Sequence, residues 1–245
     1  MKIAILGSGG REHALALKIS KSKKTEKIYC IPGNGGMTNI AENIDLNLTD
    51  FNKLLNFIEK KNIDLVIVGP EQPLVDGVVD FLTSKKIKVF GPNKIVSQLE
   101  GSKIFTKKIC EKYKIPTAKF GIFKNIDETN EFIDKSKLPI VIKADGLAAG
   151  KGVIIENELS KAKKALTKML KGQFGSASNT VVIEEFLAGV ELSVFIITDG
   201  TNYKILPEAK DYKRIGEQDT GLNTGGMGAI SPVPFANREF MDKVE

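Results

Sequence analysis

Apolar and polar segments alternate along the first hundred residues at the spacing of short strands and amphipathic helices. Four apolar runs predict buried strands because each is short and bounded by charged or turn-forming residues: KIAIL (2–6), KIYCI (27–31), LVIVG (65–69) and KVFG (88–91). The segments between these runs predict three helices: EHALALKIS, LTDFNKLLNFIEKKN and LVDGVVDFL. Thr49 is the expected N-cap of the second helix. Repeated strand–helix units of this length predict a doubly wound parallel sheet, in which ligands bind beyond the carboxyl ends of the strands.

The pattern changes after a helix expected over residues 102–113. Two further helices are predicted: IDETNEFIDKS, capped by Asp127, and SKAKKALTKML, capped by Ser160. Three strands are predicted from PIVIKA, GVIIE and TVVIEEF. A hairpin that turns at the Asp-Gly pair 199–200 is predicted from ELSVFIITDGTNYKIL. A glycine-rich loop at 219–234 leads into NREFMDKVE, which begins like an amphipathic helix. This half therefore predicts an α+β fold with antiparallel strands.

The charge of the 245-residue chain is positive but dispersed. A net charge of +6 invites a nucleic-acid partner, yet only Arg11, Arg214 and Arg238 are arginines, and the lysines lie on helix faces without interleaved aromatic residues. We therefore expect no nucleic-acid partner. No apolar run approaches the ~20 residues of a membrane span. Cys30 and Cys110 match no metal or redox spacing, so we expect a cytoplasmic protein with reduced thiols and no membrane partner.

The first glycine-rich segment, GSGGREH, follows the first predicted strand and opens the first helix. Gly7 and Gly9 fit the dinucleotide fingerprint G-x-G-x-x-G, but Glu12 stands where its third glycine belongs. The pattern therefore disfavours a nicotinamide-dependent oxidoreductase and favours phosphate binding at the helix N-terminus. The alternative is a tight turn in which Arg11 and Glu12 are only solvated. His13, the single histidine, is expected to pack or to cap.

The second glycine-rich segment, KADGLAAGKGVII, lies between two predicted strands. It is not a Walker loop, because three residues instead of four separate Gly146 from Gly150 and because Gly152 replaces the magnesium-binding hydroxyl. The segment is typical of a β-turn-β flap that closes over a triphosphate, with Lys143 and Lys151 as counter-charges. A surface hairpin tip with exposed lysines is the alternative.

The third segment, VVIEEFLAGVELS, carries acids on both sides of a predicted hinge. Glu184 and Glu185 point to opposite faces of their strand by period-two alternation, so only one of them can face a ligand. Such a hinge can offer backbone groups to adenine, while Glu191 can accept hydrogen bonds from ribose hydroxyls. Taken singly, each glutamate also fits a solvated sheet edge.

Six segments together resemble the phosphoribosylamine–glycine ligase (glycinamide ribonucleotide synthetase) family of ATP-grasp enzymes: GSGGREHAL, VGPEQPLVDG, FGPNKIVSQLEGSKIFTK, IKADGLAAGKGV, VIEEFLAGVELS and DTGLNTGGMGAISP. The resemblance covers essentially the whole chain in order. It implies the joining of glycine to 5-phosphoribosylamine through glycyl phosphate, with ATP converted to ADP and phosphate, in purine biosynthesis. ATP and magnesium, with manganese as a substitute, are the implied cofactors, and we expect a monomer.

The resemblance also implies a role for each residue that matches a family motif. Contacts to ATP are expected from Lys103, Lys143, Gly146, Gly150, Lys151, Gly152, Glu184, Glu185, Leu187 and Glu191. Phosphoribosylamine is expected near Gly9, Gly10, Arg11 and Glu71, and glycine with the transferred phosphoryl group near Asp211, Thr224 and Gly225. Lys213, Arg214 and Asn223 are the expected catalytic residues.

The family pattern implies a parallel N-terminal domain at 1–102, a bridging helix at 103–122, a small ATP-grasp subdomain at 123–190 and part of a large one at 191–245. The family usually has histidine and proline where this chain has Tyr212 and Leu222, which argues against an essential imidazole and for a less rigid loop.

Family members also continue past this point, and their metal ligands lie in the continuation. We therefore expect no metal ligands among these residues and no turnover by the chain alone. The alternatives are a non-catalytic fragment that binds nucleotide or phosphosugar, and another ATP-grasp carboxylate–amine ligase.

Overall fold

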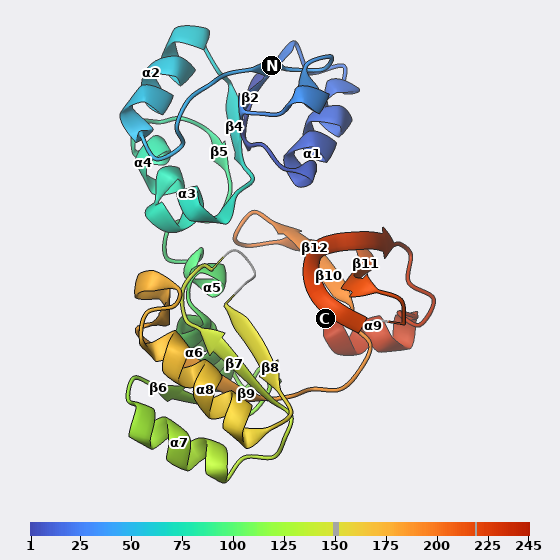
Figure 1. The fold of residues 1–245 in the computed structure, drawn as a ribbon. Coiled ribbons are helices and arrows are strands. Elements are labelled where there is room, and N and C mark those ends of the chain that lie inside the picture. Colours follow the sequence, from blue (N-terminus) through green and yellow to red (C-terminus); the bar gives the residue numbers. More distant parts are fainter. Residues whose placement is uncertain (149–151, 219) are drawn as a thin grey trace. The chain divides into compact units, whose positions relative to one another are not determined.

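The computed structural model describes residues 1–148, 152–218 and 220–245, with the side chains of Ser176, Leu222 and Asn223 left out. The chain forms two compact units, Met1–Phe186 and Leu187–Glu245. Figure 1 shows parallel strands with helices on both faces at the start of the first unit. A smaller layered sheet completes that unit, and a separate three-stranded sheet forms the second.

The N-terminal sheet is parallel and has the strand order β3-β2-β1-β4-β5, which confirms the predicted doubly wound fold. The order reverses between β1 and β4, and ligands of such sheets bind at this switch point. The elements are β1 (Lys2–Gly7), α1 (Gly10–Ser20), β2 (Lys27–Pro32), a 3-10 turn (Gly35–Met37), β3 (Glu42–Asn43), α2 (Phe51–Lys61), β4 (Leu65–Val68), α3 (Glu71–Asp76), α4 (Val78–Ser84) and β5 (Val89–Phe90).

Both faces of this sheet are buried, which explains why its strands are apolar without alternation. Ala4 and Leu6 of β1 pack with Leu54 of α2 on one face, while Ile3 and Ile5 pack with Ala16 and other residues on the opposite face. The short apolar runs of the sequence are therefore strands of a two-sided core.

The structure corrects three predicted helix starts. α2 is capped by Asp50, whose carboxylate accepts from Lys53 N at 3.0 Å, while the Thr49 hydroxyl donates to Asn47 Oδ1 instead. Since several good capping residues stand next to each start, sequence alone does not choose between them. Likewise, α7 is capped by Asn125 instead of Asp127, and α8 begins after Glu158, which makes no side-chain cap, instead of after Ser160.

The rest of the first unit is a small α+β layer with the antiparallel strand order β6-β9-β7-β8. Ile133 of α7 and Leu166 of α8 pack on Ile140 and Ile142 of β7, so alternate residues of β7 and β9 face away from these helices. Its elements are α5 (Gln98–Gly101), α6 (Lys103–Tyr113), β6 (Phe120–Phe123), α7 (Ile126–Asp134), β7 (Ile140–Ala144), β8 (Val153–Glu156), α8 (Leu159–Leu170), a 3-10 turn (Gly175–Ser178) and β9 (Val181–Glu185).

The second unit is an antiparallel sheet of the order β10-β11-β12, formed by β10 (Ser193–Thr198), β11 (Tyr203–Gly216) and β12 (Thr220–Ile230), with α9 (Arg238–Val244) after it. The predicted turn at 199–200 is confirmed: the Asp199 carboxylate accepts from Thr201 N and Asn202 N, and Gly200 has a φ of 92°. The glycine-rich tract differs from the expected loop, because most of it is the strand β12 paired with β11.

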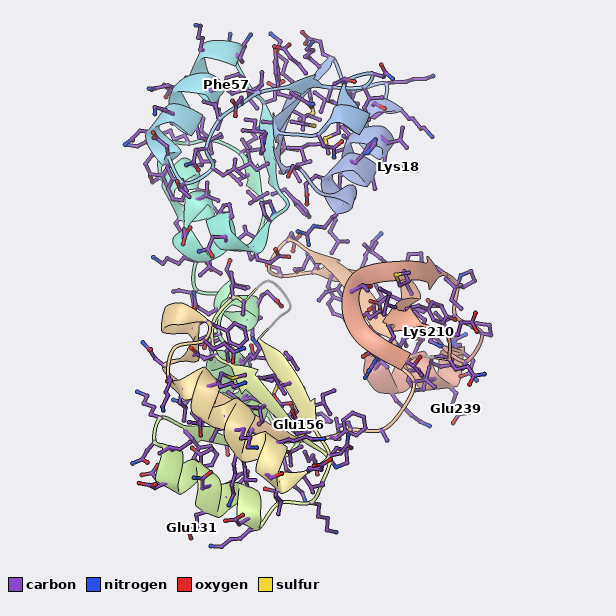
Figure 2. The ribbon with its side chains drawn as sticks, viewed as in Figure 1. Lys18, Phe57, Glu131, Glu156, Lys210 and Glu239 are labelled. Carbon is purple, nitrogen blue, oxygen red and sulfur yellow. The ribbon has the colours of Figure 1, made fainter. Side chains whose placement is uncertain are left out.

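Charged side chains lie mostly on the outside, as the dispersed pattern predicts. Lys18 of α1, Glu131 of α7 and Glu239 of α9 are exposed and point away from the ribbon (Figure 2). Among the described residues, no helix is long and apolar enough to cross a membrane.

Candidate functional site

The loops at the switch point bring together residues that are far apart in the sequence. Arg11, in the first turn of α1, donates from Nη1 to Glu71 Oε1 at 3.1 Å and from Nη2 to the Gly69 carbonyl, so it joins the carboxyl ends of β1 and β4. Burial lowers the pKa of Arg11, but the hydrogen bonds and charges of Glu12 and Glu71 outweigh burial and raise it. The predicted residues Gly9, Gly10, Arg11 and Glu71 thus gather at one edge of the sheet.

Glu12 lies under this loop instead of in solvent. The residue is 4% exposed, and its carboxylate accepts from Gly9 N at 2.7 Å and pairs with Arg11 Nε at 2.9 Å. Gly7 has a φ of 122°, and a Cβ there would lie 2.6 Å from Glu12 Cγ, so the glutamate fills the space that the glycine leaves. The alternative of a merely solvated Glu12 is therefore wrong. Its position three residues after the N-cap Gly9 was the available signal.

The loop between β7 and β8 is anchored at both ends, as the predicted β-turn-β segment requires. Lys143 is opposite Val153 in the register, and Ala144 N donates to the Gly152 carbonyl at 2.8 Å. Gly146 N donates to the Ala177 carbonyl. Gly150 and Lys151 lie outside the described residues.

α6 contributes a lysine to the base of this loop. Lys103 donates from Nζ to the Gly146 carbonyl at 3.4 Å, and its own backbone N donates to the Asp145 carbonyl. Asp145 also accepts from Ser102 Oγ at 3.0 Å and from Ile104 N at 2.9 Å, which fixes the start of α6 against the loop. Burial lowers the pKa of Lys103, with the carboxylates of Glu100 and Asp145 opposing that shift. The sequence did not single out Asp145.

Glu184 holds two lysines beside this loop. Its Oε2 lies 2.8 Å from Lys143 Nζ and 3.2 Å from Lys107 Nζ. Glu184 is 6% exposed and faces these lysines, whereas Glu185 is exposed and accepts from Lys119 N at 2.9 Å. The predicted opposition of the two glutamates is confirmed, and Lys107 is an additional residue that the motifs did not indicate.

The second unit holds the remaining predicted residues. Lys213 Nζ lies 3.2 Å from Glu191 Oε2 and 3.5 Å from Asp211 Oδ2. Burial lowers the pKa of Lys213, but the hydrogen bond and charge of Glu191, helped by Asp211, outweigh it and raise the pKa. Since Glu191 is paired with a lysine here, a ribose would compete with that lysine for its carboxylate.

Neighbouring residues of β11 and β12 bond to each other across the same sheet. Arg214 Nη1 donates to the Gly221 carbonyl at 2.9 Å, and the Thr224 hydroxyl donates to the Lys213 carbonyl at 2.8 Å. The paired strands bring Arg214 opposite Asn223, whose side chain lies outside the description. Gly225 follows on β12, and Leu187 is the exposed first residue of the unit.

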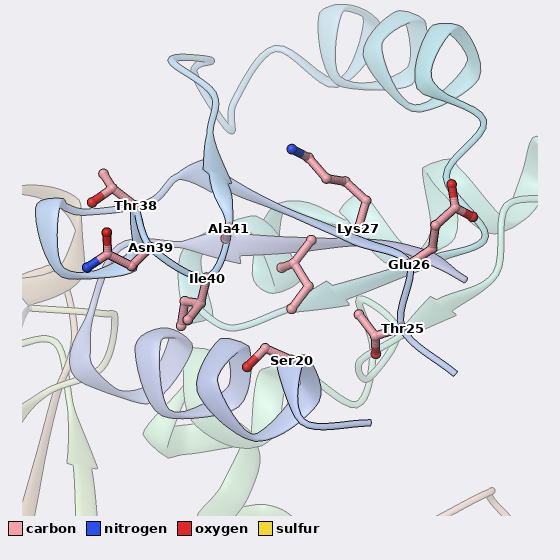
Figure 3. Close-up of a pocket in the computed structure, with 9 residues that line it drawn as sticks. Ser20, Thr25, Glu26, Lys27, Thr38, Asn39, Ile40 and Ala41 are labelled. Carbon is pink, nitrogen blue, oxygen red and sulfur yellow. The ribbon is translucent and has the colours of Figure 1, made fainter. Parts of the chain in front are cut away.

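A cavity of about 300 Å³ lies at the other end of the N-terminal sheet, lined by Ser20, Lys27 and Asn39 among others (Figure 3). Its hydroxyl groups are already used: Ser20 donates to the Leu17 carbonyl and Thr25 to the Ile19 carbonyl. Lys27 pairs with Glu42 at 3.1 Å. This cavity holds none of the residues that the sequence motifs indicate, so the switch-point and flap residues are the better candidates.

The residues near the flap suit an anion better than a metal. Lys103 and Lys143 supply ammonium groups at its base, which match phosphate oxygens. Within residues 1–148, 152–218 and 220–245, no group of three or more His, Cys, Asp or Glu side chains could hold a metal ion. The expectation that the metal ligands lie beyond Glu245 stays a prediction.

Comparison with known proteins agrees with this layout. The models of the phosphoribosylglycinamide synthetase N domain and ATP-grasp (A) domain match residues 1–100 and 101–245. Phosphoribosylamine–glycine ligases from Mesorhizobium japonicum and Clostridium acetobutylicum are each 48% identical, over 99% and 100% of this chain and 57% and 59% of their own lengths. The chain thus spans less than two thirds of these relatives.

A crystal structure of phosphoribosylamine–glycine ligase from Thermotoga maritima is 38% identical, with a TM-score of 0.82 over 95% of this chain and 56% of that one. Since the two family models together match the chain from end to end, the chain belongs to the phosphoribosylglycinamide synthetase family.

Proposed function

We propose that this chain serves the ATP-dependent ligation of glycine to 5-phosphoribosylamine, which yields glycinamide ribonucleotide, ADP and phosphate. The relatives named phosphoribosylamine–glycine ligase support the proposal, as does the family membership. Because the chain spans only part of those relatives, the activity is proposed for it as part of the catalytic unit.

The observation that carries the proposal is the pair of ammonium groups at the base of the flap. Lys103 of α6 reaches the Gly146 carbonyl, and Lys143 of β7 ends beside Glu184. ATP carries several negative charges, and a carboxylate that attacks its γ-phosphorus brings one more. Fixed cations offset this like-charge repulsion, and the enzyme gains most of its rate from such positioning and electrostatic stabilisation.

We assign the chemistry to this chain's residues as follows. Lys103, Lys143 and the flap around Gly146 and Gly152 hold the triphosphate, so that a glycine carboxylate oxygen can attack the γ-phosphorus while the bond to ADP breaks. The amine of phosphoribosylamine then attacks the acyl carbon, and phosphate leaves. The roles proposed for the hinge are adenine binding at Glu184, Glu185 and Leu187 and ribose binding at Glu191. Gly150 and Lys151 complete the proposed flap.

The other two substrates are proposed to bind at the sheet edges described above. Arg11 and Glu71, with the backbone of Gly9 and Gly10, form the proposed phosphoribosylamine site, where the helix N-terminus and the guanidinium attract phosphate. Lys213, Arg214 and Asn223 are proposed to act on the transferred phosphoryl group, with Asp211, Thr224 and Gly225 near glycine. Magnesium is expected with ATP. The described residues contain no group of three or more His, Cys, Asp or Glu side chains that could bind it, so no step is assigned to a metal.

The ligation is tested with a chimaera in which the part of the Clostridium acetobutylicum relative beyond the match follows residue 245. We expect ADP release that requires both glycine and phosphoribosylamine, and we expect Lys143→Met in the same chimaera to abolish most of it. Lys164→Met, at an exposed position of α8, is the matched control and should keep the activity.

A folded chimaera that binds ATP but ligates a different carboxylate or amine would contradict the proposal. Such an outcome would support another ATP-grasp carboxylate–amine ligase instead.

A further inference from the structure

One carboxylate oxygen of a buried glutamate contacts two lysines that differ in exposure and in their other hydrogen bonds. Lys107 of α6 and Lys143 of β7 both reach Oε2 of Glu184, at 3.2 and 2.8 Å. Their side chains are 9% and 27% exposed. The buried carboxylate therefore has more cationic partners than it needs for neutrality.

Lys107 is held in place by all of its donors. Its Nζ donates to Thr117 Oγ1 at 2.6 Å and to the Ala118 carbonyl at 3.4 Å, and its third contact is the Glu184 carboxylate. The Phe120 ring lies 5.3 Å from the same ammonium group. An ammonium group has three N–H donors, so Lys107 has none to spare for a ligand.

Lys143 has the opposite character. Among the described residues its Nζ has Glu184 as its hydrogen-bond partner, so two of its three donors remain for a ligand. It belongs to the strand that runs into the flap, next to Ala144 and Asp145. If Lys143 turned towards a phosphate, Glu184 would keep the Lys107 contact.

We propose that Lys107 is a positioning residue that permanently neutralises Glu184, so that Lys143 can leave the carboxylate and bind the phosphates of ATP. This inference rests on the proposed function, because it assumes that ATP binds at the flap. Removal of one partner from a buried ion pair is costly because it leaves the other charge uncompensated. With Lys107 present, the departure of Lys143 avoids that cost.

The charges around this pair support the assignment. Lys103 lies on the same face of α6 as Lys107, one turn earlier. Burial lowers the pKa of Lys103, and nearby charges also affect it: those of Glu100, Asp145, Lys143 and Glu184. Asp145 is already committed to Ser102 and the backbone of α6. Lys107 is thus the fixed cation among the groups that face Glu184.

The test compares the ATP affinities of the unsubstituted chain and of Lys107→Met by calorimetric titration at about pH 7.5. We expect Lys107→Met to bind ATP at least ~10-fold more weakly, because ATP must now compete with Glu184 for Lys143.

The double variant Lys107→Met with Glu184→Gln separates charge from packing. It removes the lysine and the charge that the lysine balances, so we expect its ATP affinity to lie within about threefold of that of Glu184→Gln alone. Lys108→Met, at the exposed neighbouring position of α6, should bind like the unsubstituted chain.

Equal ATP affinity of Lys107→Met and the unsubstituted chain would overturn the inference and leave the proposed function standing. A double variant that binds ATP at least ~10-fold more weakly than Glu184→Gln alone would also overturn it, because Lys107 would then act through packing. No ATP binding by the unsubstituted chain would overturn the proposed function and this inference with it.

Discussion

The Glu12 side chain lies under the first glycine-rich loop, where dinucleotide-binding proteins have a third glycine. Its carboxylate ties the Gly9 backbone to the Arg11 side chain. The sequence shows that this position differs from the fingerprint, but it does not show which groups Glu12 contacts. Those contacts depend on the direction of the side chain, which residue spacing does not encode.

Replacement of Glu12 by alanine should therefore destabilise the chain by about 2 kcal/mol, because two partly buried hydrogen bonds are lost and a void forms. Urea denaturation followed by circular dichroism measures the difference. Glu111→Ala, at an exposed position of α6, should stay within about 0.5 kcal/mol of the unsubstituted chain. Equal effects of the two substitutions would show that the buried contacts of Glu12 add no stability.

Lys103 predicts a pH dependence of ATP binding. Burial lowers its pKa, so the free chain loses this positive charge at a lower pH than an exposed lysine would. Bound phosphate favours the charged form, so ATP affinity should fall as pH rises through the lowered pKa. Lys103→Arg keeps its proton at this pH and should move the loss of affinity to higher pH.

Titrations of ATP at pH 7 to 10 measure this shift, with circular dichroism to confirm that both chains stay folded. Parallel affinity curves for Lys103→Arg and the unsubstituted chain would contradict a role for the lowered pKa.

The two cysteines should differ in reactivity. Burial, with the nearby Glu12 charge, raises the pKa of Cys30 to about 11, and the thiol lies in the sheet core. Cys110 on α6 is only partly buried. At pH 8, iodoacetamide should modify Cys110 well before Cys30, as read by peptide mass spectrometry, and urea should remove the difference. Comparable labelling of both thiols in the folded chain would contradict the buried position of Cys30.

At the scale of elements, apolar periodicity predicted most helices and strands because the core faces follow it closely. Helix starts were less predictable, since neighbouring polar residues compete for the cap. The helix expected over LVDGVVDFL also divides into α3 and α4, because Gly77 takes a φ of 98°. The tract around Gly226 and Gly228 was expected as a loop, but its backbone pairs with β11, a long-range choice that composition does not reveal.

The corrected start of α2 is directly testable. Asp50→Ala should lower Tm more than Thr49→Ala, because only the Asp50 carboxylate accepts from the first turn of the helix. Hydrogen bonds from Lys53 N and Lys53 Nζ, with its charge, lower the pKa of Asp50. The unfolded chain therefore binds more protons in this range, so the cap's contribution is present above the ordinary aspartate pKa and is lost as pH falls through the lowered one.

Thermal unfolding at pH 7 and at pH 3 measures both effects. The difference between Asp50→Ala and the unsubstituted chain should shrink at the lower pH. A larger effect of Thr49→Ala at pH 7 would restore the original expectation for the cap.

At the scale of the molecule, the sequence predicted the parallel N-terminal sheet, the β-turn-β segment and the opposed faces of Glu184 and Glu185. It brought Arg11 and Glu71 together only through the family resemblance, and it could not predict other contacts that link distant segments, such as Lys107 with Glu184. These contacts depend on how α1 and α6 lie against their sheets, which is set by the whole core and not by any local motif.

Calorimetric titration of the 245-residue chain with ATP, and separately with NAD, tests the nucleotide site most directly. We predict saturable binding of ATP, no binding of NAD, and at least ~10-fold weaker ATP binding by Lys143→Met, which loses a charge-assisted phosphate contact. Binding of NAD in place of ATP, or ATP binding that Lys143→Met leaves unchanged, would contradict an ATP site at the flap.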